Sequence, residues 1–282
     1  MKKFLALALS LAMVLSLAAC GSKSDDSNDK ETSIVVTPGK LTVATSPDYA
    51  PYEFFAIDAD GNPQLAGFDL ALAKYVADYM GLELDLIPMD FDGVLNELSA
   101  GSVDLGMAGL SPDPERADAM DFSDLYYMGK QAFVCLQSNK DQFPTLEATN
   151  DPQYSIGAQN GSIQYDLAQE FSPDADIVVL TKATDLVAEL LAGKLDGAYI
   201  EAAVGEAYAK QYPELCVALD VPYDAAGNVV GVVKGNDALL AKVNEAIAAA
   251  LADGSMDKFV AEATELASGN TASLKDGEIV VD

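Results

Sequence analysis

The chain has 282 residues and a formal net charge of −29, because 45 aspartates and glutamates outnumber 16 lysines and arginines. Hydrophobic residues make up 50% of the chain, which is typical of a globular protein and too apolar for a disordered one. Nucleic-acid binding needs clustered lysine and arginine, so no nucleic acid is expected as a partner. The chain has no histidine, which excludes catalytic triads that use imidazole, and no metal or cofactor is expected.

The first residues are typical of an export signal. Two lysines precede an apolar stretch, residues 4–19, that is short for a membrane span. It runs into Leu17-Ala18-Ala19-Cys20, which resembles the lipobox of bacterial lipoproteins, where the cysteine is lipidated and becomes the new N-terminus. The alternative is an ordinary cleavage site with an incidental cysteine. We therefore predict a signal peptide over 1–19 and, over 20–39, a lipidated Cys20 with a polar, flexible tether.

From residue 40 onward, predicted strands alternate with predicted helices. In residues 82–86, leucines alternate with acids at the period of a strand, whereas 68–80 has helical spacing with Asp69 as candidate N-cap. The predicted strands are 41–45, 82–86, 103–108, 131–137, 155–158, 177–180, 195–200, 214–221 and 229–233. The predicted helices are 68–80, 92–100, one that opens at Pro114 after Asp113, 163–171, 184–192, 201–211, 237–252 and 256–266. This alternation indicates βαβ units and parallel sheets.

Two features lie outside that alternation. Residues 267–282 are predicted to be a C-terminal surface tail. Cys135 and Cys216 fall on two predicted strands, and both a disulfide and a pair of buried free thiols remain open.

Several stretches resemble the solute-binding proteins of polar amino-acid ABC importers, which are family 3 of the bacterial extracellular solute-binding proteins. They include LTVATSPDYAPYEF (41–54), IPMDFDGVLNELSAGSVDLGMAGLS (87–111), PERADAMDFSDLYY (114–127), GAQNGSIQYDLAQE (157–170) and LAGKLDGAYIE (191–201). The resemblance implies an α/β, two-lobed periplasmic-binding-protein-like fold (type II), with mostly parallel sheets flanked by helices and a two-strand hinge. Lobe 1 would be 40–128 plus 224–266, lobe 2 would be 131–221, and the ligand would lie between them.

Arg116 is the candidate for binding a ligand carboxylate, because a guanidinium can bind a carboxylate with two parallel hydrogen bonds. The resemblance gives Ser111 and Gly109 the same role, through hydroxyl and peptide N–H groups. The alternative for Arg116 is a surface helix charge paired with Asp113 or Asp118.

In lobe 2 the resemblance implies that Ser162 donates to the same carboxylate and that Ile163 flanks the ligand. Glu201 is the candidate for the ligand ammonium, at a position where the family usually has aspartate. The alternatives are a plain helix cap for Ser162 and a first-turn glutamate favoured by the helix dipole for Glu201.

Tyr49 and Phe91 match family aromatics that sandwich the ligand side chain. Ser46 occupies a position where relatives that bind basic amino acids often have an acid, which favours a free amino acid with an uncharged or polar side chain. Asp48 and Glu53 lie close enough in the sequence to oppose that inference.

These features predict a non-enzymatic, monomeric receptor that is exported and lipid-anchored to the outer face of the cell membrane. It would bind a free amino acid between two closing lobes and deliver it to the permease subunits of an ABC transporter. The alternatives are an enzyme on the same scaffold, similar to cyclohexadienyl dehydratases, and a sensory lipoprotein that takes no part in transport.

Overall fold

The structure is a computed structural model that describes residues 34–282 except 226, 270, 276–277 and 282. The predicted signal peptide, Cys20 and most of the predicted tether lie outside the described residues.

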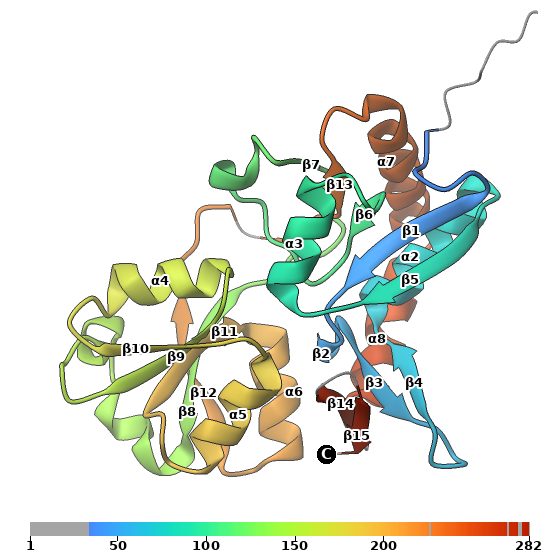
Figure 1. The fold of residues 1–282 in the computed structure, drawn as a ribbon. Helices are drawn as coiled ribbons and strands as arrows, with labels where there is room; N and C mark the ends of the chain where they lie inside the picture. Colours follow the sequence, from blue (N-terminus) through green and yellow to red (C-terminus); the bar gives the residue numbers. More distant parts are fainter. Residues whose placement is uncertain (1–33, 226, 270, 276–277, 282) are drawn as a thin grey trace, which may run out of the picture. The chain divides into compact units, whose positions relative to one another are not determined.

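The first of two large sheets has the strand order β5-β1-β6-β13-β7 (Figure 1). Its strand β1 (Lys40–Thr45) pairs in parallel with β5 (Glu83–Pro88) and β6 (Leu105–Gly106). Strand β13 (Gly231–Val233) runs antiparallel to β6 and to β7 (Met120–Phe122). We call this sheet and the elements packed on it lobe 1.

Helices cover both faces of the lobe 1 sheet. Alternate residues of β1 point to opposite faces, so Leu41 and Val43 belong to one hydrophobic cluster and Ala44 to another. The first face is covered by α2 (Phe68–Met80), α7 (Asp237–Ala252) and α8 (Ser255–Leu266). The second face is covered by α3 (Phe91–Ser99), as Figure 1 shows.

The second large sheet, which with its helices we call lobe 2, has the order β10-β9-β11-β8-β12. Its strands are β8 (Gln131–Leu136), β9 (Ser155–Gln159), β10 (Asp176–Leu180), β11 (Gly197–Glu201) and β12 (Leu215–Val221). Its helices are α4 (Ile163–Phe171), α5 (Ala183–Leu191) and α6 (Ala202–Gln211), with the short 3-10 helices η2 (Gln137–Gln142) and η3 (Leu146–Thr149). Phe133 on β8 packs with the α4 side, and Val134 packs with the side of α5 and α6.

A third, smaller sheet belongs to lobe 1 and contains the C-terminal residues. Strand β3 (Glu53–Ile57) pairs with β2 (Asp48–Tyr49) and β4 (Pro63–Ala66). Strand β14 (Thr271–Lys275) pairs with β3 and then with β15 (Glu278–Val281). The sequence predicts only a surface tail here, but main-chain pairing with β3 orders the segment, since β3 offers an unpaired edge.

The chain crosses between the lobes twice, after β7 and after β12. The two crossing segments pair with each other: Tyr127 and Asn228 form an antiparallel bridge, in which the Asn228 N–H donates to the Tyr127 carbonyl at 2.8 Å. This is the predicted two-strand hinge.

The α/β, two-lobed fold is confirmed, but the prediction of mostly parallel sheets is wrong because both sheets are mixed. Strands joined by a helical crossover run parallel, as expected. Strand β8 enters lobe 2 directly from the first crossing between lobes, so no crossover within the sheet fixes its direction, and it pairs antiparallel with both β11 and β12.

Two local predictions need correction. The N-cap of α2 is Gly67, because the Asp69 carboxylate is buried and accepts hydrogen bonds from Gly109 and Tyr126. The helix predicted at Pro114 is one 3-10 turn, η1 (Pro114–Arg116), although Asp113 does cap it by accepting the Glu115 N–H at 2.9 Å.

Cys135 on β8 and Cys216 on β12 are directly opposite each other in the lobe 2 sheet. They are free thiols with 3.9 Å between their sulfurs, and burial raises the pKa of Cys135 to about 12. Cys135 therefore contributes to the core as a neutral group, and Cys216 is buried in the same hydrophobic cluster.

Candidate functional site

A pocket lies between the two lobes. Lobe 1 contributes Tyr49, Phe91, Ala108, Gly109, Leu110, Ser111 and Arg116, and lobe 2 contributes Gln159, Ile163 and Gln164. The pocket thus brings together six of the nine predicted ligand-binding residues, and Ser46, Ser162 and Glu201 are not among its lining.

The positions of these residues follow from the direction of the strands. The chain leaves the carboxyl end of β1 toward Tyr49, that of β5 toward Phe91, and that of β6 toward Ser111. In lobe 2 it leaves the carboxyl end of β9 at Gln159 and enters α4. Ligands of open α/β sheets bind outside the carboxyl ends of the strands, and here two such edges face each other.

Arg116 is the cation of the pocket wall and contacts both lobes. Its Nε lies 3.0 Å from Asp113 Oδ2, and its Nη2 donates to the Gly161 carbonyl at 3.0 Å. Its guanidinium carbon is 6.0 Å from the centre of the Phe91 ring. The Asp113 pair proposed as an alternative does form, yet with only 12% of its side chain exposed, Arg116 is no solvated surface charge.

Gly109 shapes the pocket but has no N–H to offer. Its φ of 59° is left-handed, and an added Cβ would lie 3.1 Å from Tyr49 Cδ1. Its N–H already donates to Asp69 Oδ2 at 2.9 Å, so the expectation that it donates to the ligand carboxylate needs correction.

Ser162 is the N-cap of α4. Its hydroxyl accepts the Tyr165 N–H at 3.3 Å and donates to the Gln159 carbonyl at 2.8 Å. The structure therefore shows the helix-cap role that the sequence left open, while Ile163 in the first turn of the same helix lines the pocket.

Glu201 lies behind the lobe 2 wall of the pocket and is fully buried. Its carboxylate accepts hydrogen bonds from Tyr52 Oη at 2.8 Å and from Gln131 Nε2 at 3.0 Å. Its N–H donates to Tyr49 Oη at 3.1 Å, which connects it to the pocket. Burial raises the pKa of Glu201 to about 7, although the two donors oppose that rise.

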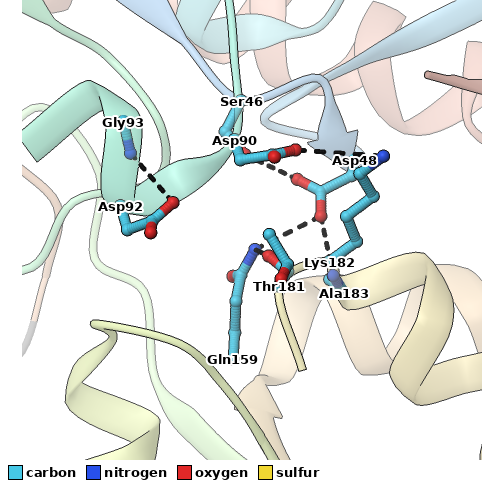
Figure 2. Close-up of polar contacts among 9 residues, drawn as sticks. All are labelled: Ser46, Asp48, Asp90, Asp92, Gly93, Gln159, Thr181, Lys182 and Ala183. Atoms are coloured by element: carbon cyan, nitrogen blue, oxygen red, sulfur yellow. Dashed lines mark hydrogen bonds and ion pairs between the residues drawn. The ribbon is translucent and has the colours of Figure 1, made fainter. Parts of the chain in front are cut away.

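Asp48 is hydrogen-bonded to both lobes beside the pocket, whereas from the sequence it was considered only as an acid that opposes the inference of an uncharged ligand (Figure 2). It lies on lobe 1, where its Oδ1 accepts the Ser46 hydroxyl at 2.7 Å. Its Oδ2 accepts two donors from lobe 2, the Ala183 N–H at 2.6 Å and Gln159 Nε2 at 3.2 Å. Burial raises the pKa of Asp48 to about 6. The signal available in the sequence was an acid beside a predicted ligand aromatic, Tyr49.

Two further pairs join the lobes near Asp48. Asn160 Nδ2 donates to Asp92 Oδ2 at 3.1 Å, and Lys182 Nζ lies 3.9 Å from Asp90 Oδ1. In each of these pairs lobe 1 supplies the acid and lobe 2 the donor, and Figure 2 shows Asp48 and Asp90 with their lobe 2 partners.

Two more acids are buried in lobe 1 beneath the pocket. Asp69 accepts the Tyr126 hydroxyl at 2.6 Å, and burial raises its pKa to about 6. Neither carboxyl oxygen of Glu53 has a hydrogen-bond partner. Burial, reinforced by the charge of Asp69, raises the pKa of Glu53 well above its ordinary value.

Within the ranges that the structure describes, no group of three or more acids or cysteines is arranged to hold a metal ion. In the same part of the chain, none of the helices has the length and apolar character needed to cross a bilayer.

Two lobes, a paired hinge and a pocket lined from both sides define a hinged ligand-binding protein. The family model of the bacterial extracellular solute-binding proteins, family 3, matches residues 41–263, and the chain belongs to this family. It is therefore an exported solute-binding protein.

The chain is similar to two binding proteins and to one enzyme. The arginine-binding extracellular protein ArtP of Bacillus subtilis is 32% identical, over 92% of this chain and 96% of its own length. The crystal structure of an amino acid ABC transporter substrate-binding protein, AbpA, from Streptococcus pneumoniae bound to L-arginine matches with a TM-score of 0.78 at 32% identity, over 81% of this chain and 96% of that one. A cyclohexadienyl dehydratase of Pseudomonas aeruginosa is 26% identical, over 74% of this chain and 77% of its own length.

The buried carboxyls predict that the protein loses stability as the pH rises. Glu53, Asp48, Asp69 and Glu201 all have pKa values above those of the unfolded chain, so the folded state binds more protons. Their stabilisation is complete below the unfolded pKa of about 4 and is lost as the pH rises through the folded values. The free energy of unfolding in urea should therefore be several kcal/mol lower at pH 8 than at pH 5, at roughly 1.4 kcal/mol per unit of pKa shift.

Glu53→Gln tests the origin of this pH dependence, because it keeps the shape of the side chain and removes one titrating group. It should reduce the loss between pH 5 and pH 8, whereas Asp60→Asn in the exposed turn after β3 should not. An unchanged loss in Glu53→Gln would show that Glu53 is not protonated in the folded state.

Proposed function

We propose that this protein is a lipid-anchored receptor that binds a free amino acid between its lobes and delivers it to an ABC transporter permease. The observation that carries the proposal is the interlobe pocket, with Arg116 on its lobe 1 wall and Glu201 behind its lobe 2 wall. The names of ArtP and AbpA support a free amino acid as the class of ligand.

Arg116 binds the ligand carboxylate. A guanidinium has five N–H donors, and the two hydrogen-bonding contacts of Arg116, to Asp113 and to Gly161, leave others for the ligand. Ser111 lies on the same wall and adds a hydroxyl. Asp113 and Gly161 fix the guanidinium before the ligand arrives, which lowers the entropic cost of binding.

Glu201 supplies the negative charge for the ligand ammonium. Its carboxylate does not line the pocket and acts across two amides: Gln131 Nε2 donates to it at 3.0 Å, and Gln131 Oε1 accepts Gln164 Nε2 at 2.7 Å, which leaves the Gln164 carbonyl oxygen for the ammonium. The ligand side chain lies between Tyr49 and Phe91, where aromatic rings provide apolar contact area. Both lobes thus contact one ligand, and closure about the hinge at 123–130 and 222–230 completes the site.

An enzyme on this scaffold is the second candidate, and the pKa of Glu201 near 7 is the observation that favours it. A general acid or base must contact the atom that it protonates or deprotonates, however. The Glu201 carboxylate is instead hydrogen-bonded to Tyr52 and Gln131 and does not line the pocket. A receptor is therefore the better proposal, and turnover of prephenate or arogenate by the purified protein would contradict it.

The first prediction concerns Arg116. Arg116→Ala should weaken binding of the amino acid at least about 30-fold, because loss of one partner of a desolvated charge pair costs roughly 2–5 kcal/mol. Isothermal titration against the twenty common amino acids measures the effect. Lys74→Ala on the exposed part of α2 is the control and should bind as the wild type does. Wild type that binds no amino acid, or Arg116→Ala that binds undiminished, would overturn the proposal.

The second prediction concerns pH. An ammonium group beside Glu201 favours the ionised carboxylate, so a protonated Glu201 must release its proton when the ligand binds. Affinity should therefore fall about tenfold per pH unit below about pH 7. Titrations from pH 5 to pH 8 in buffers of different ionisation enthalpy measure the dissociation constant and the proton released.

Glu201→Gln should bind more weakly at pH 8 and should lose this pH dependence. If the variant keeps the wild-type slope, then another group is responsible and Glu201 does not bind the ammonium.

The third prediction concerns the anchor. Cys20→Ser removes the acceptor of the proposed lipid, so the variant should leave the membrane fraction while its amino-acid binding stays unchanged. Fractionation of expressing cells, followed by mass spectrometry of the mature N-terminus, is the measurement. Membrane association of Cys20→Ser equal to that of the wild type would contradict lipidation at this residue.

A further inference from the structure

The side-chain amide of Gln159 is held in one orientation. Its Nε2 donates to Asp48 Oδ2 at 3.2 Å and to the Thr181 carbonyl at 3.1 Å, as Figure 2 shows. Both partners are acceptors, so they require the nitrogen, and the reversed amide would place oxygen against oxygen. Since both N–H groups are used, the only polar atom that Gln159 can offer the pocket is its carbonyl oxygen.

Gln164, the other glutamine of the pocket wall, is oriented in the same sense by Glu201. Gln131 Nε2 donates to the Glu201 carboxylate at 3.0 Å, which leaves Gln131 Oε1 to accept Gln164 Nε2 at 2.7 Å. The same Nε2 lies 3.3 Å from Tyr49 Oη. The only polar side-chain atom that Gln164 can offer the pocket is therefore its carbonyl oxygen, on the side of the Glu201 network.

The two glutamines differ in which part of a bound amino acid they can contact. Gln164 belongs to the network of Glu201, which is proposed to bind the ammonium. Gln159 belongs to the network of Asp48 and Ser46, beside the aromatic Tyr49 that contacts the side chain. Gln159 is therefore placed to contact the ligand side chain.

We infer that Gln159, held by Asp48, selects amino acids whose side chains carry N–H donors, such as amide, guanidinium or ammonium groups, over those that end in a carboxylate. This inference rests on the proposed receptor function and names the substrate class of the same pocket. A carboxylate would place its oxygen against the Gln159 carbonyl, with the Asp48 charge directly behind it, and neither can donate. Lys182 offsets part of the Asp48 charge, but its Nζ lies toward Asp90 and it does not line the pocket, so it offers a ligand carboxylate no hydrogen bond.

Glutamine and glutamate are the matched probes, since they differ only in the terminal amide or carboxylate. At pH 8, where Asp48 is ionised, the wild type should bind glutamine or arginine on the order of 100-fold more tightly than glutamate. Isothermal titration, with competition for weak ligands, measures the ratio of dissociation constants.

Asp48→Ala releases the Gln159 amide to rotate and present its nitrogen, so the preference for glutamine over glutamate should fall at least about tenfold. Asp48→Asn is the matched variant: its Oδ1 can accept the same two N–H groups, so only the part of the discrimination that comes from the Asp48 charge should be lost, and the variant should still prefer glutamine more strongly than Asp48→Ala does. Asp60→Asn controls for the loss of one acidic charge at an exposed position. If Asp48→Ala does not fold, Gln159→Met removes the acceptor directly and should weaken glutamine binding without strengthening that of glutamate.

The outcomes separate the inference from the proposed function. Wild type that binds glutamate as tightly as glutamine and arginine, or that binds only amino acids with apolar side chains, overturns the inference and leaves the receptor standing. An equal ratio in Asp48→Ala and Asp48→Asn also overturns it. Wild type that binds none of the common amino acids overturns the receptor itself.

Discussion

When the two lobes close, the charged groups between them lose contact with water and must form hydrogen bonds or ion pairs inside the closed pocket. This requirement determines how the site is organised. Asp48 belongs to lobe 1, yet two of its hydrogen-bond donors come from lobe 2. Arg116 also belongs to lobe 1, and it donates across the pocket to Gly161. A buried charge without a partner costs several kcal/mol, so these groups favour the one arrangement of the lobes in which their partners are in reach.

The same constraint explains how an acid can act on a pocket that it does not line. Asp48 and Glu201 each require donors, and each accepts one hydrogen bond from the side-chain amide of a glutamine, Gln159 or Gln131. An amide that turns its nitrogen toward an acid turns its oxygen the other way. The carboxylates behind the pocket wall thus orient amide oxygens, which are hydrogen-bond acceptors, toward the pocket. No further carboxylate has to be buried there.

The sequence predicted the fold class, the extent of α4 and α7, and the residues at strand ends, because hydrophobic periodicity and capping residues are local signals. It could not predict that β8 runs antiparallel to both of its neighbours, β11 and β12, since the direction of a strand that follows a crossing between lobes depends on distant pairing. It named Arg116, Tyr49 and Phe91 from their motifs, but not Asp48 or Gln159. Their roles come from contacts between residues more than a hundred positions apart, which no local pattern encodes.

Glu201 connects the pocket to the hinge. It is the last residue of β11 and pairs with Gln131, the first residue of β8, where the chain enters lobe 2. One of its donors, Tyr52, comes from lobe 1, and a side chain at Gly129 in the hinge would collide with its carboxylate. A rotation of the lobes therefore moves Tyr52 relative to Gln131 and changes how well the ionised carboxylate is solvated. Under the proposed function a ligand ammonium stabilises that same ionised form, so the charge of the ligand and the closure of the lobes would act on one carboxyl group and favour each other.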